Sequence, residues 1–104
     1  LDRPTAIFAC NDLMAVGVIS AATELGLSVP EDLSVVGFDD VKLASFANPP
    51  LTTVVQPKHE IGVLATEMLL ERVSNLQAPP RVKRLDTKLV VRNSTARFVS
   101  PDAI

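Results

Sequence analysis

The stretch from Leu33 to Asp40 reads LSVVGFDD, and the rest of the chain is organised around it. Its apolar run predicts a strand that is buried on both faces, as in the parallel sheets of α/β proteins. The run stops at two consecutive carboxylates, and ligands of open α/β sheets bind just beyond the carboxyl ends of the strands. Aspartate is also a preferred turn residue, so position alone leaves a binding role and a turn role open for Asp39 and Asp40.

The composition predicts one small soluble domain that does not bind nucleic acid by itself. The chain has 104 residues, 47% of them hydrophobic, and a formal net charge of −2. Its Lys and Arg residues are scattered, so it lacks the basic stripe that neutralises phosphates. The single cysteine excludes an internal disulfide framework, and neither a signal peptide nor an apolar run of membrane length is present. These features favour a cytoplasmic protein with no membrane partner.

The first half of the chain predicts a strand, a helix and a second strand. Residues 5–10 form an apolar run after a proline, and Asn11 is a good helix N-cap. The helix should end near Leu25, with Gly26 in the left-handed position that follows many helices. With the strand at 33–38 this makes a βαβ unit, whose two strands run parallel. Because the first strand begins almost at residue 1, we expect the chain to be part of a longer protein.

The second half continues with a loop or short helix over 41–50 and a β-rich third strand at 52–55. Pro57 suits the first turn of a helix, and an amphipathic pattern extends from there to Leu76. A Pro-containing connector then leads into a loosely alternating final strand at 81–93.

The first helix is apolar nearly all round, which predicts packing on more than one side. We expect one face to cover the sheet, namely Met14, Val18, Ala21, Ala22 and Leu25. A second face, with Leu13, Val16, Gly17 and Ser20, has nothing left in the chain to pack against. The following loop adds Leu43, Phe46 and Ala47. An exposed apolar patch of this kind usually marks a partner site.

Four motifs resemble the lactose-repressor (LacI/GalR) family and occur in the same order. They are NDLMAVG at 11–17, VPEDLSVVGFDD at 29–40, PLTTVVQ at 50–56 and LVVRNST at 89–95, so the resemblance covers about residues 4–96. Members of this family are bacterial transcription regulators. They join an N-terminal helix-turn-helix to a two-lobed effector domain that is related to periplasmic sugar-binding proteins.

The resemblance implies a parallel-sheet, periplasmic-binding-protein-like (type I) α/β fold, of which only part is present. Residues 4–55 would belong to the C-terminal lobe, and residues 56–80 would cross to the N-terminal lobe and place a helix there. Residues 81–96 would return as a strand, and 97–104 would form a tail. The chain contains no helix-turn-helix motif, so any contact with operator DNA would come through that absent domain.

Asn11, Asp39 and Gln56 each follow the carboxyl end of a predicted strand, which places all three on one rim of the sheet. A carboxylate accepts hydroxyl donors, and amides both donate and accept, so the set suits a sugar or a nucleoside. The resemblance likewise implies that these three positions line the effector cleft. The alternative roles are an N-cap for Asn11, a turn for Asp39 and a linker for Gln56.

The resemblance also implies a symmetric homodimer. Its interface would contain Leu13, Val16, Gly17, Ser20, Phe46 and Ala47. Asp12 and Asp40 are expected to stabilise the starts of the helix and of the loop instead of contacting ligand.

An enzyme is the more distant alternative class, with Asp39 and Asp40 at a magnesium or phosphoryl-transfer site. Aspartate-based phosphatases have an Asp-x-Asp pattern, but position 41 is Val, and receiver domains have a lysine where Gln56 stands. We therefore predict no catalytic residue, no cofactor and no metal. The first alternative to a repressor is a secreted, periplasmic sugar-binding protein, which shares the two-lobed fold.

Overall fold

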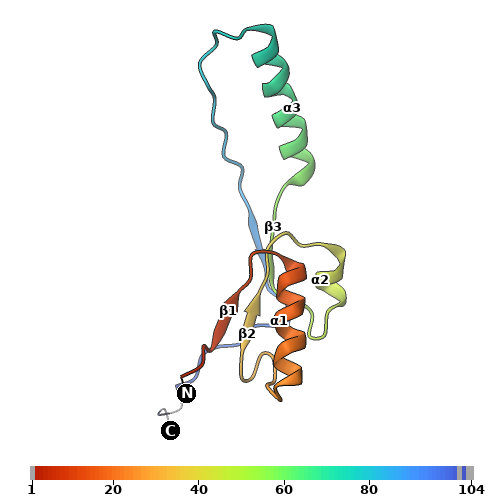
Figure 1. Ribbon diagram of the computed structural model, residues 1–104, viewed down its shortest axis with the longest axis vertical. Helices are drawn as coiled ribbons and strands as arrows, with labels where there is room; N and C mark the ends of the chain where they lie inside the picture. The colour runs from red at the N-terminus through yellow and green to blue at the C-terminus, as the bar shows by residue number, and fades with distance from the viewer. Residues whose placement is uncertain (1, 101, 103–104) are drawn as a thin grey trace. The chain divides into compact units, whose positions relative to one another are not determined.

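A computed structural model describes residues 2–100 and 102, and these divide into two units. The first unit comprises the chain up to Val55 and again from Lys88 onward, and the second comprises Gln56–Thr87 (Figure 1). The predicted tail at 97–104 extends over residues 101, 103 and 104, which lie outside the described residues. Within the described residues, no helix has both the length and the apolar character needed to cross a membrane.

The first unit is built on two parallel strands. β1 (Ala6–Phe8) pairs with β2 (Ser34–Val36) in the register Ala6–Ser34, Ile7–Val35 and Phe8–Val36. The helix α1 (Asp12–Glu24) connects them and packs on β2 (Figure 1). The predicted α/β class and its parallel strand pair are therefore confirmed.

The unit is completed by an antiparallel pair, β3 (Thr53–Val55) with β4 (Lys88–Val90). Two isolated parallel bridges, Val36–Thr52 and Asp39–Val55, join this pair to the end of β2. The loop between β2 and β3 contains the short helix α2 (Lys42–Phe46), which contacts α1. The end of β2 and the strand β3 thus run side by side in the same direction.

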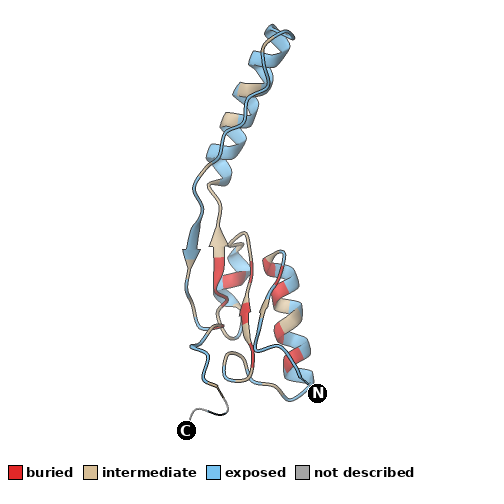
Figure 2. Cartoon of the chain, turned by 90° about the vertical axis from the view of Figure 1, so that its left-hand side faces the viewer, coloured by how far each residue is buried: buried red, intermediate tan, exposed pale blue. Residues whose placement is uncertain are grey.

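The face of α1 that covers the sheet agrees only in part with the predicted one: Ala22 is buried and Val18 packs against the core, as expected. Its buried residues are Asp12, Ala15, Ile19 and Ala22, which are spaced by three or four positions (Figure 2). The prediction for Met14, Ala21 and Leu25 is wrong, because all three are exposed. Asp12, the first residue of the helix, also points inward, where its carboxylate accepts hydrogen bonds from Thr53 and from the Val41 backbone N–H. Asn11 caps the helix and Gly26 has a φ of 74°, as expected.

The central strand is not buried on both faces in this chain. Leu33, Val35 and Gly37 are buried on the side of α1, whereas the alternate residues are partly exposed. The opposite side has no helix over it among the described residues, and it borders a hollow of about 440 Å³ that residues 95–99 help to line. Phe8 is 64% exposed. Because only one layer of helix packs on the strands, only every second side chain is removed from water.

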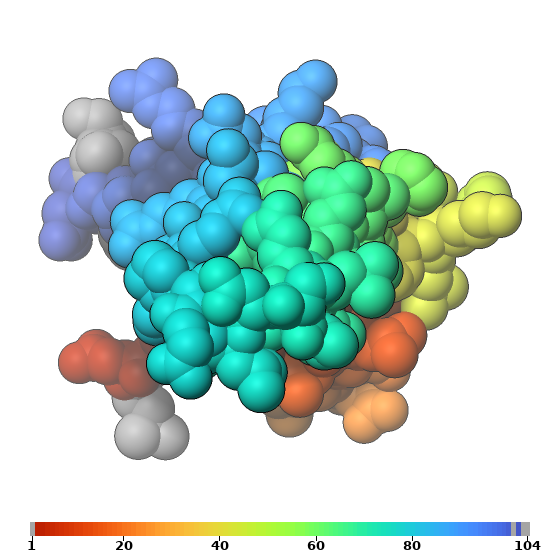
Figure 3. Space-filling model, turned by 90° about the horizontal axis from the view of Figure 1, so that it is seen from above, coloured from red at the N-terminus to blue at the C-terminus, as the bar shows by residue number. Residues whose placement is uncertain are grey.

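The second unit consists of α3 (Lys58–Ser74) and the segment that follows it, side by side in Figure 3. None of the seventeen residues of α3, all of them described, is buried. The final strand is also shorter than predicted, since only Lys88–Val90 of the 81–96 range is a strand. Residues 81–87 have no hydrogen-bonded neighbouring strand among the described residues, and a strand requires one.

Candidate functional site

Asn11 and Asp39 both lie beyond the carboxyl ends of the paired strands β1 and β2. Phe8 is in register with Val36, and each of the two polar residues follows three positions later. Asp39 is in turn paired with Val55, and its backbone N–H donates to the Val54 carbonyl at 2.8 Å. Both residues are only partly exposed. The structure therefore brings two of the three predicted ligand-binding residues to one edge of the first unit.

The backbone at the acidic pair has an unusual conformation. We call residues 37–41, which link β2 to α2, the acidic loop. Within it Asp39 has a φ of 121° and Asp40 a φ of 55°, and they are the two non-glycine residues with positive φ among those described. Residues with side chains rarely adopt such values, and conformations of this kind concentrate at functional sites. The acidic loop thus contains a residue, Asp39, whose backbone conformation is rarely adopted by a residue with a side chain.

Asn11 has the N-cap role that was the alternative to ligand binding. Its Oδ1 atom accepts a hydrogen bond from the backbone N–H of Met14 at 2.9 Å, which caps α1. The cap uses the amide oxygen, so the Nδ2 group can still donate to a ligand. Capping and ligand binding therefore use different atoms of Asn11.

Asp40 is held by Arg92, which follows β4. One guanidinium nitrogen, Nη2, lies 2.8 Å from the Asp40 carboxylate, and the other, Nη1, donates to the Leu51 carbonyl at 3.0 Å. This arrangement fits the expected role of Asp40 in stabilising the loop. Arg92 is not among the predicted site residues, since its only signal in the sequence is its place in the LVVRNST motif.

Asp12 is only 1% exposed, although aspartate is an ionisable residue and this one begins a helix. Its Oδ1 atom accepts from the Thr53 hydroxyl at 2.5 Å, and its Oδ2 atom accepts from the Val41 backbone N–H at 2.8 Å. Gly37 lies directly against it, because a Cβ atom there would collide with Asp12 Oδ1. Asp12 thus joins α1, β3 and the acidic loop, which goes well beyond the expected stabilisation of a helix start.

Gln56, the third predicted ligand residue, directly follows Val55 and is the first residue of the second unit. Its side chain is partly buried, and it takes part in an interaction. That Asn11, Asp39 and Gln56 line a single cleft stays a prediction.

The residues predicted for a dimer interface lie on α1 and in or next to α2. Leu13 is 66% exposed and Phe46 is 79% exposed, and both Gly17 and Ser20 are exposed. Val16 is partly buried, and so is Ala47, which packs against the core of the unit. The helices α1 and α2 contact each other, so these residues belong to two neighbouring elements.

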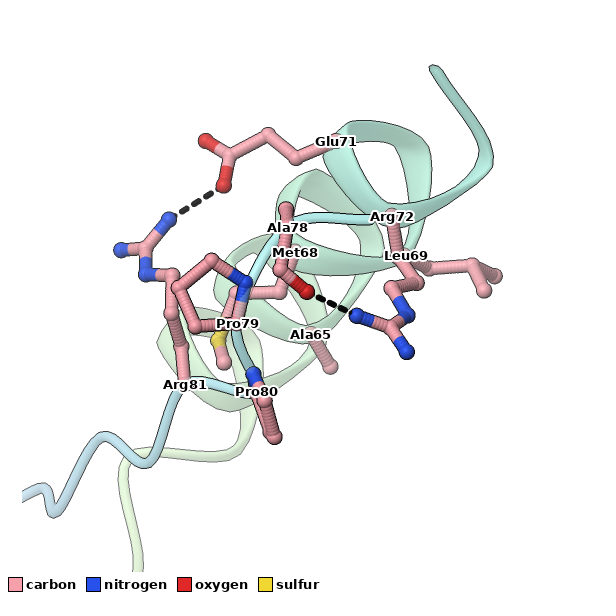
Figure 4. A pocket seen from close by; sticks show the side chains of 9 residues that line it. All are labelled: Ala65, Met68, Leu69, Glu71, Arg72, Ala78, Pro79, Pro80 and Arg81. Atoms are coloured by element: carbon pink, nitrogen blue, oxygen red, sulfur yellow. Dashed lines mark hydrogen bonds and ion pairs between the residues drawn. The ribbon is translucent and has the colours of Figure 1, made fainter. Parts of the chain in front are cut away.

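The second unit has a hollow of about 530 Å³ whose lining is mostly apolar, unlike the polar edge of the first unit (Figure 4). It lies between α3 and residues 78–81 and is lined mostly by apolar side chains such as Met68 and Leu69. Its charged residues are engaged at the edge, since Arg81 pairs with Glu71 and Arg72 donates to a backbone carbonyl. Few polar groups point into it, and a ligand site needs several that converge. We regard it as a packing surface.

Among the described residues, no group of three or more His, Cys, Asp or Glu side chains could hold a metal ion.

Comparison with known proteins identifies the family. Residues 1–95 match the family model described as "Periplasmic binding protein-like domain". The HTH-type transcriptional repressor PurR of Vibrio vulnificus (strain CMCP6) is 47% identical over 93% of this chain, and the matched region is 29% of that repressor. The chain thus spans less than a third of the length of this curated relative.

Solved structures agree. A LacI family transcriptional regulator from Enterococcus faecalis V583 with bound ribose matches with a TM-score of 0.83 and 36% identity, over 94% of this chain and 37% of that one. The lac repressor dimer bound to operator and the anti-inducer ONPF matches with a TM-score of 0.80 and 41% identity, over 90% of this chain and 32% of that one. The chain therefore belongs to the periplasmic binding protein-like domain family, in the form found in LacI-type regulators.

Proposed function

We propose that this chain is the effector-sensing and dimerisation part of a LacI-type transcriptional regulator, and that its effector is a sugar or a nucleoside. The observation that carries the proposal is the pair of positive-φ aspartates just beyond β2, at the same edge of the strand pair as Asn11 beyond β1. Parallel strands that end at one edge are where α/β proteins bind ligands. The match to a regulator that contains bound ribose supports the same effector class.

The chemistry of the rim suits hydroxyl groups. Asp39 would accept hydrogen bonds from ligand hydroxyls, and the Asn11 Nδ2 group would donate to a ligand oxygen. Gln56 would contribute from the start of the second unit, at the crossing from the C-terminal lobe (residues 4–55) to the N-terminal lobe (residues 56–80). No residue of the rim is assigned to catalysis, a cofactor or a metal.

Dimerisation would use the exposed side chains of α1 and α2. Leu13 and Phe46 are large apolar side chains that are mostly exposed, and a contiguous apolar patch on a surface often marks an interface. The dimeric lac repressor structure supports a homodimer. Operator DNA would be bound by a helix-turn-helix elsewhere in the protein, and such a regulator acts in the cytoplasm.

Calorimetry on the full-length protein that contains this chain tests the proposal. Ribose, other pentoses and hexoses, and a set of nucleosides are titrated against the wild type, Asp39→Asn and Asp40→Asn. Asparagine keeps the shape of aspartate and tolerates positive φ, so the matched pair isolates the charge. Loss of a charged partner should cost roughly 1.5–3 kcal/mol, about tenfold to a hundredfold in affinity, for Asp39→Asn.

Asp40→Asn should lose clearly less affinity, because Asp40 is paired with Arg92. Ligand should also change operator binding by the wild type and not by Asp39→Asn. Equal losses in both variants would show that the pair is structural. Failure of every sugar and nucleoside to bind the wild type would overturn the proposal.

A further inference from the structure

Three successive residues of the acidic loop are fixed by three different elements. The Asp39 backbone N–H donates to Val54 at β3. The Asp40 carboxylate pairs with Arg92 after β4. The Val41 backbone N–H donates to the Asp12 carboxylate at the start of α1. Strained backbone persists only where its surroundings hold it in place.

Of these three anchors, only the third depends on a buried carboxylate, that of Asp12. Among the described residues, Asp12 is the only Asp, Glu, Lys or Arg residue whose side chain is fully buried. A buried polar group is costly unless it is hydrogen-bonded, and both of its oxygens accept such bonds. The bond to Thr53 ties the carboxylate to β3, so the Val41 N–H is anchored to the sheet through it.

Gly37 gives independent support for the same arrangement. A Cβ atom at Gly37 would lie 2.9 Å from Leu51 Cδ2 and would collide with the Asp12 carboxylate. The loop can therefore leave β2 at this point only because residue 37 has no side chain. Asp12 and Gly37 fit together, one from the NDLMAVG motif and the other from VPEDLSVVGFDD.

We propose that Asp12 is a positioning residue for the ligand rim: its buried carboxylate links Val41 to Thr53 of β3 and thereby fixes Asp39 in its positive-φ conformation. Asp12 itself does not touch the ligand, since it is buried beneath the acidic loop. This inference rests on the proposed function, because the position of Asp39 matters only if Asp39 binds a ligand.

Hydrogen exchange followed by NMR on the full-length protein tests the anchoring without any ligand. In Asp12→Ala the Val41 amide loses its acceptor, so it should exchange at least ~10-fold faster, while the Val35 amide keeps its protection. Asp12→Asn should restore most of the protection, since its amide oxygen can accept from Val41 and its NH₂ group can donate to the Thr53 hydroxyl.

Ser94→Ala is the matched control. Ser94 is equally buried, and its hydroxyl accepts from the Thr52 N–H at 2.8 Å and donates to the Val35 carbonyl at 2.5 Å. Its removal should expose the Thr52 amide to exchange and leave the Val41 amide protected. If Asp12→Ala does not fold, Asp12→Ser takes its place, because serine keeps a polar helix start but is too short to reach Val41.

Ribose titration of the full-length protein gives the second readout, with Asp39→Asn alongside. Asp12→Ala should weaken binding about tenfold or more, and Ser94→Ala should leave the affinity within about twofold. Unchanged exchange at Val41 in Asp12→Ala would overturn the inference, and so would equal losses of affinity in Asp12→Ala and Ser94→Ala. If the wild type binds ribose and Asp39→Asn binds it equally tightly, the proposed function fails instead, whatever the exchange rates show.

Discussion

Arg92 lies 2.8 Å from Asp40 and joins the end of β4 to the acidic loop. The two side chains are 20% and 22% exposed, so their ion pair is largely shielded from water. The same guanidinium group donates to the Leu51 carbonyl, at the start of the segment that leads into β3. One residue thus holds together the return strand, the third strand and a loop with strained backbone.

We expect Arg92→Lys to lower the free energy of unfolding by about 1–2 kcal/mol, even though it keeps the charge. A lysine ammonium group is a point charge and cannot reach a carboxylate and a carbonyl with the planar fork of arginine. Urea denaturation of the 104-residue chain measures the change. Arg97→Lys, on an exposed arginine of the same unit, is the control and should change stability by less than about 0.5 kcal/mol. Equal stability of the two variants would contradict a role for the fork.

The positive φ of Asp39 should lower the stability of the fold, although the residue at this position serves ligand binding. Alanine at a φ of 121° keeps the strain, whereas glycine adopts such values readily. Asp39→Gly should therefore be about 1–2 kcal/mol more stable than Asp39→Ala, and both should bind ligand equally poorly. Urea denaturation and calorimetry on the two variants measure the two effects. A less stable glycine variant would mean that the conformation is not strained.

Asn11 combines two roles that a single substitution can separate. Asn11→Ser keeps an oxygen that can cap α1 but removes the Nδ2 donor, so stability should change by less than about 0.5 kcal/mol. Asn11→Ala removes both groups and should lose about 1 kcal/mol of stability. If the amide contacts ligand, both variants should lose affinity to a similar degree in calorimetry on the full-length protein. Full affinity in Asn11→Ser would leave Asn11 with the capping role alone.

The order of the elements could be predicted from the sequence because it depends on local signals. Helix ends are marked by Asn11, which caps α1, by Gly26, which has a positive φ, and by Pro57, whose ring fixes φ. Each of these signals acts within one turn of the chain. The positions of Asp39 and Asn11 at one edge followed from strand order, because parallel strands end on the same side.

The rotation of α1 could not be predicted, because it is set by contacts distant in sequence. Asp12 is bonded to Thr53, 41 residues away, and Val41, 29 residues away, and these bonds turn a charged residue inward. A helix that is apolar on all sides does not indicate which face is buried. Burial of β2 on both faces was wrong for a related reason, since a strand pattern does not show whether a second layer of helices is present in the chain.

Val16 offers the sharpest test of the proposed dimer. It lies on α1 beside the exposed Leu13 and Gly17, and it is partly buried within the first unit. At the centre of a symmetric interface, Val16→Asp would place two unpaired charges close together, one from each copy, away from water. We expect the full-length protein with this change to sediment as a monomer at micromolar concentration, while the wild type sediments as a dimer. Leu25→Asp, at an exposed position after the same helix and outside the predicted interface, should leave the dimer intact. If Val16→Asp is still dimeric, or if both variants dissociate alike, the interface lies elsewhere.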